Sequence, residues 1–390
     1  MFQEGQTGIY IHWPFCLSKC PYCDFNIYLR QEHNPLDWRA AYMRAIEAHQ
    51  ALMPKAEIVS IYFGGGTPSL MAVDDIEAII SSVYKGWRVA KYVEITLEAN
   101  PTSTETDTFK AFKAAGVNRL SLGVQSLSDA ALKFLGRLHS AQEVRRAIDI
   151  AGDIFDRFTF DLIYALPDQS LSDWEHELRA AIPLMRGHLS AYQLTIKEGT
   201  AFEKQLQRGN LHPHDEDSIA AFFNLTYDMM AAAGMPAYEI SNFGASGHES
   251  RHNQIYWHYN DYIGIGAGAH GRISYDGQKF ATEDYKRPAE WMEAVGQRGH
   301  GAKPHTLIPP QERLTEALMG ALRMKKRFDL HALLARCGLP PQDWERYISK
   351  DRLDVLSEQG WLTYDHDQTS ITPNREGWLQ TDSILPFILK

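Results

Sequence analysis

Apolar and polar positions follow a repeating order along the first half of the chain. Short apolar runs rich in β-branched and aromatic residues end at Trp13 or fall within residues 58–70, 92–101, 119–126, 158–169 and 188–196. Stretches with helical spacing separate them, over 36–52, over 74–85, up to about residue 115, and on both sides of a break near residues 139–140. This alternation is typical of parallel βαβ units. Six such units predict an α/β fold, a partial (β/α)6 TIM-like barrel rather than a closed eightfold one.

Polar residues fall where these strands end. A cysteine-rich loop follows the first strand, a glycine run (Gly64–Gly66) ends the second, and Glu98, Gln125 and Asp161 lie in or at the ends of later strands. The carboxyl ends of barrel strands form the active-site face. Each residue also has an ordinary alternative: Glu98 as a helix cap, Gln125 as a loop partner, Asp161 as an ion-pair partner. Together they favour a site at this face.

Three of the four cysteines lie on one loop, Cys16, Cys20 and Cys23, with the spacing C-x3-C-x2-C. Three thiolates on a short loop can converge on a soft metal site. Iron–sulfur clusters and structural zinc usually take four protein ligands, so this loop leaves one metal position open. A small chelating molecule could fill it. The alternatives are a zinc knuckle or three unrelated buried thiols.

The chain beyond residue 196 predicts a helix over 214–234, a further strand within 237–243, and then a dense polar and aromatic passage. In that passage His252, Asn253, Tyr256 and Trp257 could line a pocket for a flat ligand, and histidine is a common haem ligand. The alternative is a turn with the aromatic residues packed beneath it and the histidines exposed.

The local composition predicts a domain boundary in the last third of the chain. Residues 296–310 are rich in glycine and proline and predict a linker between a domain over 1–295 and a small, mainly helical domain over 311–390. Cys337, within the latter, is expected to be a core cysteine.

The formal net charge of -10 argues against a nucleic-acid partner. The sequence contains no run of eighteen apolar residues, so no membrane span is predicted. The N-terminal residues lack the features of a signal peptide. With three of its four cysteines grouped on one metal-type loop, the chain is expected in a reducing compartment, the cytoplasm.

Taken together, YIHWPFC, CPYCDF, FGGGTPS, LEANP, SLGVQS, DLIYALPDQ and HNQIYW resemble the coproporphyrinogen III dehydrogenase (HemN-like) group of the radical S-adenosylmethionine (SAM) superfamily. The resemblance implies a 4Fe-4S cluster on Cys16, Cys20 and Cys23, with SAM on its fourth iron. The residues it implies as SAM contacts are Tyr10, Tyr22, Gly65, Gly66, Thr67, Glu98, Gln125, Arg137 and Asp161.

Two departures separate the branches of this group. The oxygen-independent coproporphyrinogen III oxidase carries a further cysteine two positions after the third, where this chain has Phe25, and a longer N-terminal extension. The chain is therefore more similar to the haem-chaperone branch, HemW, which also has an H-N-x-x-Y-W motif. His252 is the first candidate haem contact, with Asn253, Tyr256 and Trp257 shaping the pocket.

That branch implies haem as cargo, a reductant for the cluster, and haem-acceptor proteins such as membrane-bound respiratory enzymes, reached peripherally at the inner membrane. Reductive cleavage of SAM stays open, as does a homodimer. The alternatives are an oxidase that decarboxylates coproporphyrinogen III to protoporphyrinogen IX, and a metal-stabilised fold without haem traffic.

Overall fold

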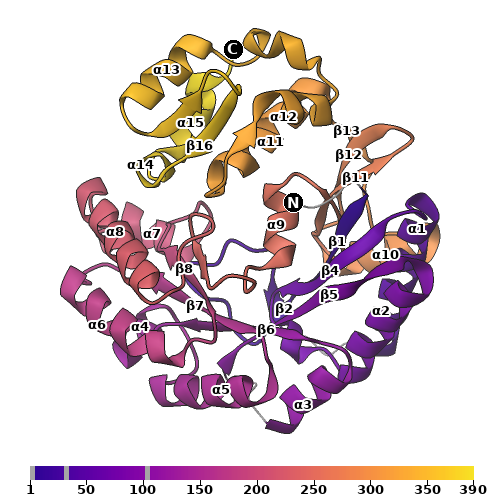
Figure 1. Ribbon diagram of the computed structural model, residues 1–390. Coiled ribbons are helices and arrows are strands. Elements are labelled where there is room, and N and C mark those ends of the chain that lie inside the picture. The colour runs from indigo at the N-terminus through magenta and orange to yellow at the C-terminus, as the bar shows by residue number, and fades with distance from the viewer. Residues whose placement is uncertain (1–4, 30–34, 102–105) are drawn as a thin grey trace.

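Six parallel strands form the centre of the molecule. The computed structural model describes residues 5–29, 35–101 and 106–390 (Figure 1). Within it the parallel strands neighbour one another in chain order: β1 (Gln6–Trp13), β4 (Glu57–Gly65), β5 (Arg88–Ala99), β6 (Arg119–Gln125), β7 (Phe158–Tyr164) and β8 (His188–Gln193). Their apolar residues are buried in near-continuous runs, as expected for strands covered on both faces. The predicted partial (β/α)6 barrel is confirmed.

Helices follow the strands and cover the outer face of the curved sheet (Figure 1). They are α1 (Pro35–Leu52), α2 (Val73–Gly86), α3 (Thr106–Ala114), α4 (Asp129–Phe134), α5 (Ala141–Ile154), α6 (Leu171–Ala181), α7 (Ala201–Gln207) and α8 (Glu216–Ala232), with 3-10 turns η1 (Pro68–Leu70) and η3 (Ile182–Leu184). The break predicted near residues 139–140 separates α4 from α5. Ser140 there caps α5, because its hydroxyl accepts from the Glu143 N–H and the Glu143 carboxylate accepts from the Ser140 N–H.

The sheet continues beyond the six predicted strands. β9 (Asn242–Gly244) adds antiparallel to β8, while β10 (Asp261–Ile265) pairs parallel with β1 and leads to β11 (His270–Tyr275), β12 (Gln278–Glu283) and β13 (Thr306–Leu307). Helix α10 (Pro288–Arg298) precedes β13. The segment 296–310, which the sequence predicts as a linker, contains the end of α10 and the edge strand β13, and β13 is hydrogen-bonded to β12. Over the described parts of the chain, no helix combines the length and apolar character needed to cross a membrane.

The C-terminal residues build a smaller unit with its own core. Its elements are α11 (Pro310–Arg323), β14 (Phe328–Asp329), α12 (Leu330–Cys337), η4 (Pro341–Arg346), α13 (Lys350–Glu358), β15 (Leu362–Asp365), β16 (Ser370–Pro373), α14 (Arg375–Trp378) and α15 (Thr381–Ile388). Cys337 is fully buried in that core, as the sequence predicts. The unit is tied to the barrel by Arg323, whose Nε donates to Glu239 Oε2 over 2.6 Å.

Candidate functional site

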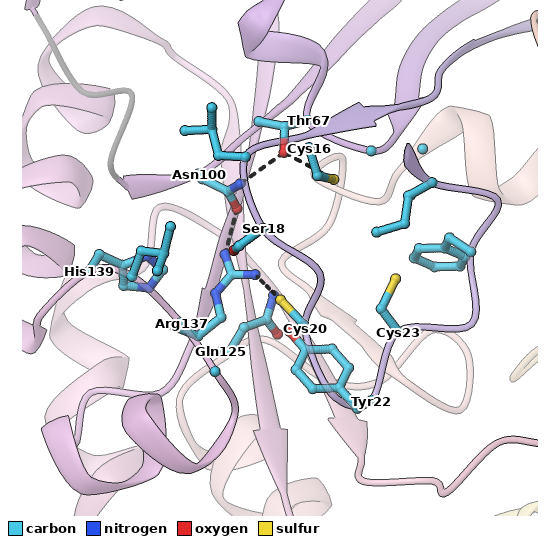
Figure 2. A pocket seen from close by; sticks show the side chains of 17 residues that line it. Cys16, Ser18, Cys20, Tyr22, Cys23, Thr67, Asn100, Gln125, Arg137 and His139 are labelled. Carbon is cyan, nitrogen blue, oxygen red and sulfur yellow. Dashed lines mark hydrogen bonds between the residues drawn. The ribbon is translucent and has the colours of Figure 1, made fainter. Parts of the chain in front are cut away.

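The predicted cysteine loop and glycine loop meet at the carboxyl ends of the strands. Cys16 ends the short strand β2 (Phe15–Cys16), which pairs with β3 (Tyr28–Leu29). Cys16, Cys20 and Cys23 line a cavity of about 150 Å³ (Figure 2). Its other predicted lining residues are Tyr22, Gly65, Gly66, Thr67, Gln125 and Arg137. The structure thus brings together residues that are as much as 121 positions apart, from Cys16 to Arg137.

The chemistry of this donor set fits an iron–sulfur cluster. Burial raises the pKa of the Cys16 thiol, and it raises that of Cys23 to about 11, so the thiolates need a compensating positive charge. A cluster supplies that charge and takes cysteine thiolates as ligands. No three metal-binding side chains of the described residues converge on one ion position; the thiols stand instead around the cavity wall.

A chain of hydrogen bonds connects Cys16 to Cys20 through the side chains of three other residues. The Thr67 hydroxyl donates to Cys16 Sγ over 3.5 Å and accepts from Asn100 Nδ2 over 3.1 Å. Arg137 donates from Nη2 to Asn100 Oδ1 at 2.5 Å and from Nη1 to Cys20 Sγ at 3.4 Å (Figure 2). Asn100 therefore joins the glycine loop to the arginine. Sequence reasoning missed it, although it follows Glu98 by two positions at the end of the same strand.

The backbone around Gly65 and Gly66 leaves no room for a side chain. Gly65 has φ +109°, where a side chain is strained, and a Cβ on Gly66 would lie 2.6 Å from the carbonyl oxygen of Phe15. This close approach allows Gly66 N–H to donate to Trp13 O and Thr67 N–H to donate to Phe15 O. The glycine run therefore fixes the cysteine loop against β4.

A second, larger cavity of about 380 Å³ adjoins the first, and Tyr22, Cys23, Phe25 and Gln125 line both. Glu98 and Asp161 face it from β5 and β7. Burial raises the pKa of Glu98 to about 7 although the Tyr62 hydroxyl donates to it over 2.8 Å, and burial raises the pKa of Asp161 to about 6. Burial thus brings the pKa of both carboxyls closer to neutral pH, so that each can exchange a proton with a ligand.

Tyr10 is the predicted contact that lines neither cavity. Its hydroxyl lies 3.0 Å from His12 Nδ1 and its ring stacks on Tyr62, with 6.2 Å between centroids. Gln125, the last residue of β6, lines both cavities and has a positive φ of 74°, a conformation that residues other than glycine rarely adopt.

The HNQIYW passage forms a helix, α9 (Arg251–Trp257), not the turn with exposed histidines considered as the alternative. His252 is 1% exposed. Its Nδ1 lies 2.9 Å from Ser60 Oγ and its Nε2 lies 2.7 Å from the Tyr256 hydroxyl, so neither ring nitrogen is free in this conformation. Asn253 alone of the four motif residues lines the larger cavity, whereas the Trp257 ring faces Arg323 of the C-terminal unit.

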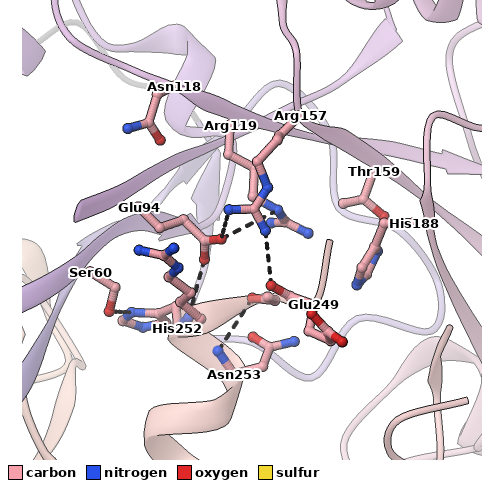
Figure 3. A network of polar contacts seen from close by, with 12 residues as sticks. Ser60, Glu94, Asn118, Arg119, Arg157, Thr159, His188, Glu249, His252 and Asn253 are labelled. Carbon is pink, nitrogen blue, oxygen red and sulfur yellow. Dashed lines mark hydrogen bonds and ion pairs between the residues drawn. The ribbon is translucent and has the colours of Figure 1, made fainter. Parts of the chain in front are cut away.

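Helix α9 lies at the end of the barrel opposite the cysteines. The backbone N–H of His252, in this helix, donates to Glu94, a fully buried carboxylate that also pairs with Arg157 (Figure 3). Arg119 begins β6 and Arg157 immediately precedes β7, so this network belongs to the amino ends of the strands. The cysteine loop and the HNQIYW motif are thus connected by the larger cavity rather than adjoining each other.

This fold, with a three-cysteine loop at the carboxyl ends of its strands, defines the class of radical SAM proteins. The family model described as the radical SAM superfamily matches residues 10–181. Among solved structures, the coproporphyrinogen III oxidase HemN of Escherichia coli, a radical SAM enzyme, has a similar fold with a TM-score of 0.82. Its sequence identity is 20%, over 98% of this chain and 90% of that chain.

Curated relatives match over nearly the whole length. The haem chaperone HemW of Escherichia coli is 36% identical, covering 100% of both chains. HemW of Synechocystis is 35% identical over 95% of this chain and 89% of its own. The mitochondrial radical SAM domain-containing protein 1 of zebrafish is 33% identical over 98% of this chain and 87% of its own. The chain therefore belongs to the HemW family of the radical SAM superfamily. Membership of this superfamily implies a 4Fe-4S cluster and SAM as cofactors.

Proposed function

We propose that this protein is a haem chaperone that holds a 4Fe-4S cluster and SAM and passes haem to acceptor proteins. The observation that carries the proposal is the match to HemW of Escherichia coli along the full length of both chains. Phe25 supports it, because this residue stands where the oxidase branch is expected to carry a fourth cysteine. The Phe25 side chain is 65% exposed and lines both cavities.

In this proposal Cys16, Cys20 and Cys23 ligate the cluster, and Arg137 offsets the negative charge of the thiolates through its contact with Cys20. Tyr22, Gly65, Gly66 and Thr67 line the same cavity as the three cysteines. The proposed SAM contacts are these four residues with Tyr10, Glu98, Gln125, Arg137 and Asp161. When bound, the cluster supplies an electron and SAM the radical chemistry. The chain's own groups orient the cofactors: Glu98 and Asp161 present carboxyl oxygens, and Arg137 holds Asn100 and Cys20 in place.

The proposed haem contact lies on the HNQIYW helix, and the structure suggests a different role for each of its candidate residues. Direct ligation of iron by His252 requires that one of its ring nitrogens give up its bond, Nδ1 to Ser60 or Nε2 to Tyr256. Asn253 reaches the cavity without any such change. We therefore propose that Asn253 contacts the ligand, that His252 and Tyr256 hold the helix, and that Trp257 connects it to the C-terminal unit, with His252 ligation as the competing form.

The proposed partners are a cellular reductant for the cluster and haem-requiring acceptors, among them membrane-bound respiratory enzymes. The proposed setting is the cytoplasm, with peripheral membrane association through those acceptors.

The test reconstitutes the cluster anaerobically, titrates the full-length protein with haem, and assays the same preparation for coproporphyrinogen III turnover with SAM and reductant. Stoichiometric haem binding without turnover is the expected result. The Phe25→Cys variant, which places a fourth cysteine in this loop, is the matched control. Turnover by the wild-type protein would favour the oxidase, and failure to bind haem would overturn the chaperone proposal.

A further inference from the structure

An arginine at the floor of the larger cavity is buried without a close partner. Arg119 is 3% exposed and lines this cavity together with Ser121 and Asn253. Within the described residues its guanidinium has one ion pair, Nε to Glu94 Oε2, at 4.0 Å, and no hydrogen bond. A buried guanidinium is costly unless its donors are used. Here the donors face a space large enough for part of a ligand.

The buried charged groups around Arg119 carry an excess of positive charge. Glu94 is shared, because it also pairs with Arg157 Nη1 at 3.1 Å and accepts from the His252 N–H at 3.1 Å (Figure 3). The two histidines nearby are neutral: burial and Arg119 lower the pKa of His252 to about 3, and the same causes lower that of His188. Two guanidiniums therefore share one fully buried carboxylate.

Among the described residues, the other acidic groups form no ion pair with Arg119, although its charge lowers the pKa of Asp161 against the larger effect of burial. Glu249 lies beside Arg157, whose Nη2 donates to the Glu249 backbone oxygen at 2.9 Å. Glu98 and Asp161 line the same cavity further along their strands, among the proposed SAM contacts. No carboxylate of the described residues lies within 4.0 Å of Arg119 apart from Glu94.

Two neutral donors flank the arginine. The Ser121 side chain lies two positions along β6 from Arg119, and its hydroxyl makes no hydrogen bond among the described residues. The side-chain amide of Asn253, in the first turn of α9, likewise makes no hydrogen bond within the described chain, whereas its backbone N–H donates to Ser250 Oγ. A guanidinium with a hydroxyl and an amide beside it suits the two oxygens of a carboxylate.

The cavity also has a route to the outside. Its lining runs along β6 from Arg119 to Gln125 and continues past β8 to the exposed residues Thr195 and Lys197. A carboxylate-bearing arm that enters beside β8, where Tyr22 and Cys23 of the cysteine loop also line the cavity, can thus reach Arg119.

We propose that Arg119, with Ser121 and Asn253, forms a subsite for a carboxylate group of the ligand carried by this protein. The inference rests on the proposed function and deepens it: with haem as cargo, the carboxylate is that of a propionate side chain. Arg119 recognises the acid group, whereas the HNQIYW helix contributes Asn253 and holds the floor closed.

The experiment titrates the full-length, cluster-reconstituted protein with haem and with haem dimethyl ester, in the same detergent-containing buffer, by following Soret absorbance. Wild-type protein is expected to bind haem about tenfold more tightly than the ester, the effect of one charge-assisted contact. Arg119→Gln should weaken haem binding alone and bring the two affinities within about twofold. Arg119→Lys should keep part of the preference, and Arg146→Gln, on an exposed part of α5, should keep all of it.

Equal binding of haem and ester by the wild type would overturn the subsite while leaving the chaperone proposal intact. So would a preference that survives in Arg119→Gln, or an equal loss for both ligands. If Arg119→Gln does not fold, Arg119→Lys and Ser121→Ala decide, since each should reduce the preference. Absence of haem binding by the wild type would overturn the proposed function and the subsite together.

Discussion

Replacing His252 with alanine removes the side chain that connects α9 to the barrel. Its two ring nitrogens satisfy the hydroxyls of Ser60 and Tyr256, at 2.9 and 2.7 Å, and its ring stacks on Tyr62 with 4.9 Å between centroids. In His252→Ala both hydroxyls lose their partner in a buried setting, and a cavity the size of an imidazole forms between Tyr62 and Tyr256.

The expected loss in the free energy of unfolding is about 3–7 kcal/mol, the sum for two orphaned hydroxyls and the lost ring packing. Each orphaned buried hydroxyl costs about 1–3 kcal/mol, and the lost ring packing adds about 1 kcal/mol more. Urea unfolding of the full-length protein measures the loss. His252→Asn, which restores one hydrogen bond, should lose about half as much. The matched control is His176→Ala, an exposed histidine on α6, with an expected change below about 0.5 kcal/mol.

The same histidine gives the loss a pH dependence. Because burial lowers its folded-state pKa to about 3, below the value of 6.5 for an unfolded chain, only the unfolded state takes up a proton between these values. Wild-type stability is therefore fully present above pH 6.5 and falls as pH drops toward 3. The difference from His252→Ala should shrink by at most about 1.4 kcal/mol per pH unit in that window. A loss below about 0.5 kcal/mol at pH 7.5 would refute the structural role assigned to the two bonds.

Three further substitutions test other parts of the structure. Glu98→Gln should raise thermal stability relative to wild type, by an amount that grows as pH rises from 4.5 through the folded pKa of about 7, while weakening SAM binding measured by calorimetry; an equal melting temperature at pH 8 would contradict the burial argument. Asn100→Ala should reduce SAM affinity about tenfold with the overall fold intact by circular dichroism, because Arg137 loses its 2.5 Å acceptor; unchanged affinity would show that the bridge is dispensable. Arg323→Ala should destabilise by about 2–4 kcal/mol in urea because it leaves the fully buried Glu239 unpaired, and adding Glu239→Gln should recover part of that loss.

The barrel was predictable because its signals are local. Each strand is a short apolar run and each crossover a helical repeat, and parallel strands necessarily bring their carboxyl ends to one edge. The cysteine and glycine loops at that edge could therefore be placed together from the sequence, and the structure lines one cavity with both. The sheet beyond β8 was less predictable. Its added strands are short, and their pairing depends on how the chain returns to β1.

What the sequence by itself determined is thus the six-strand framework, the chemistry of its cysteine face and membership of a superfamily. Tertiary structure alone decided which side chains lie behind that face and at the opposite floor. Asn100 joins Thr67 to Arg137 through contacts that span more than thirty positions, and Ser60 meets His252 across 192. No local pattern encodes such pairs, because they depend on the closure of a long loop, and burial then sets whether His252 is free or bonded and whether Arg119 has a partner.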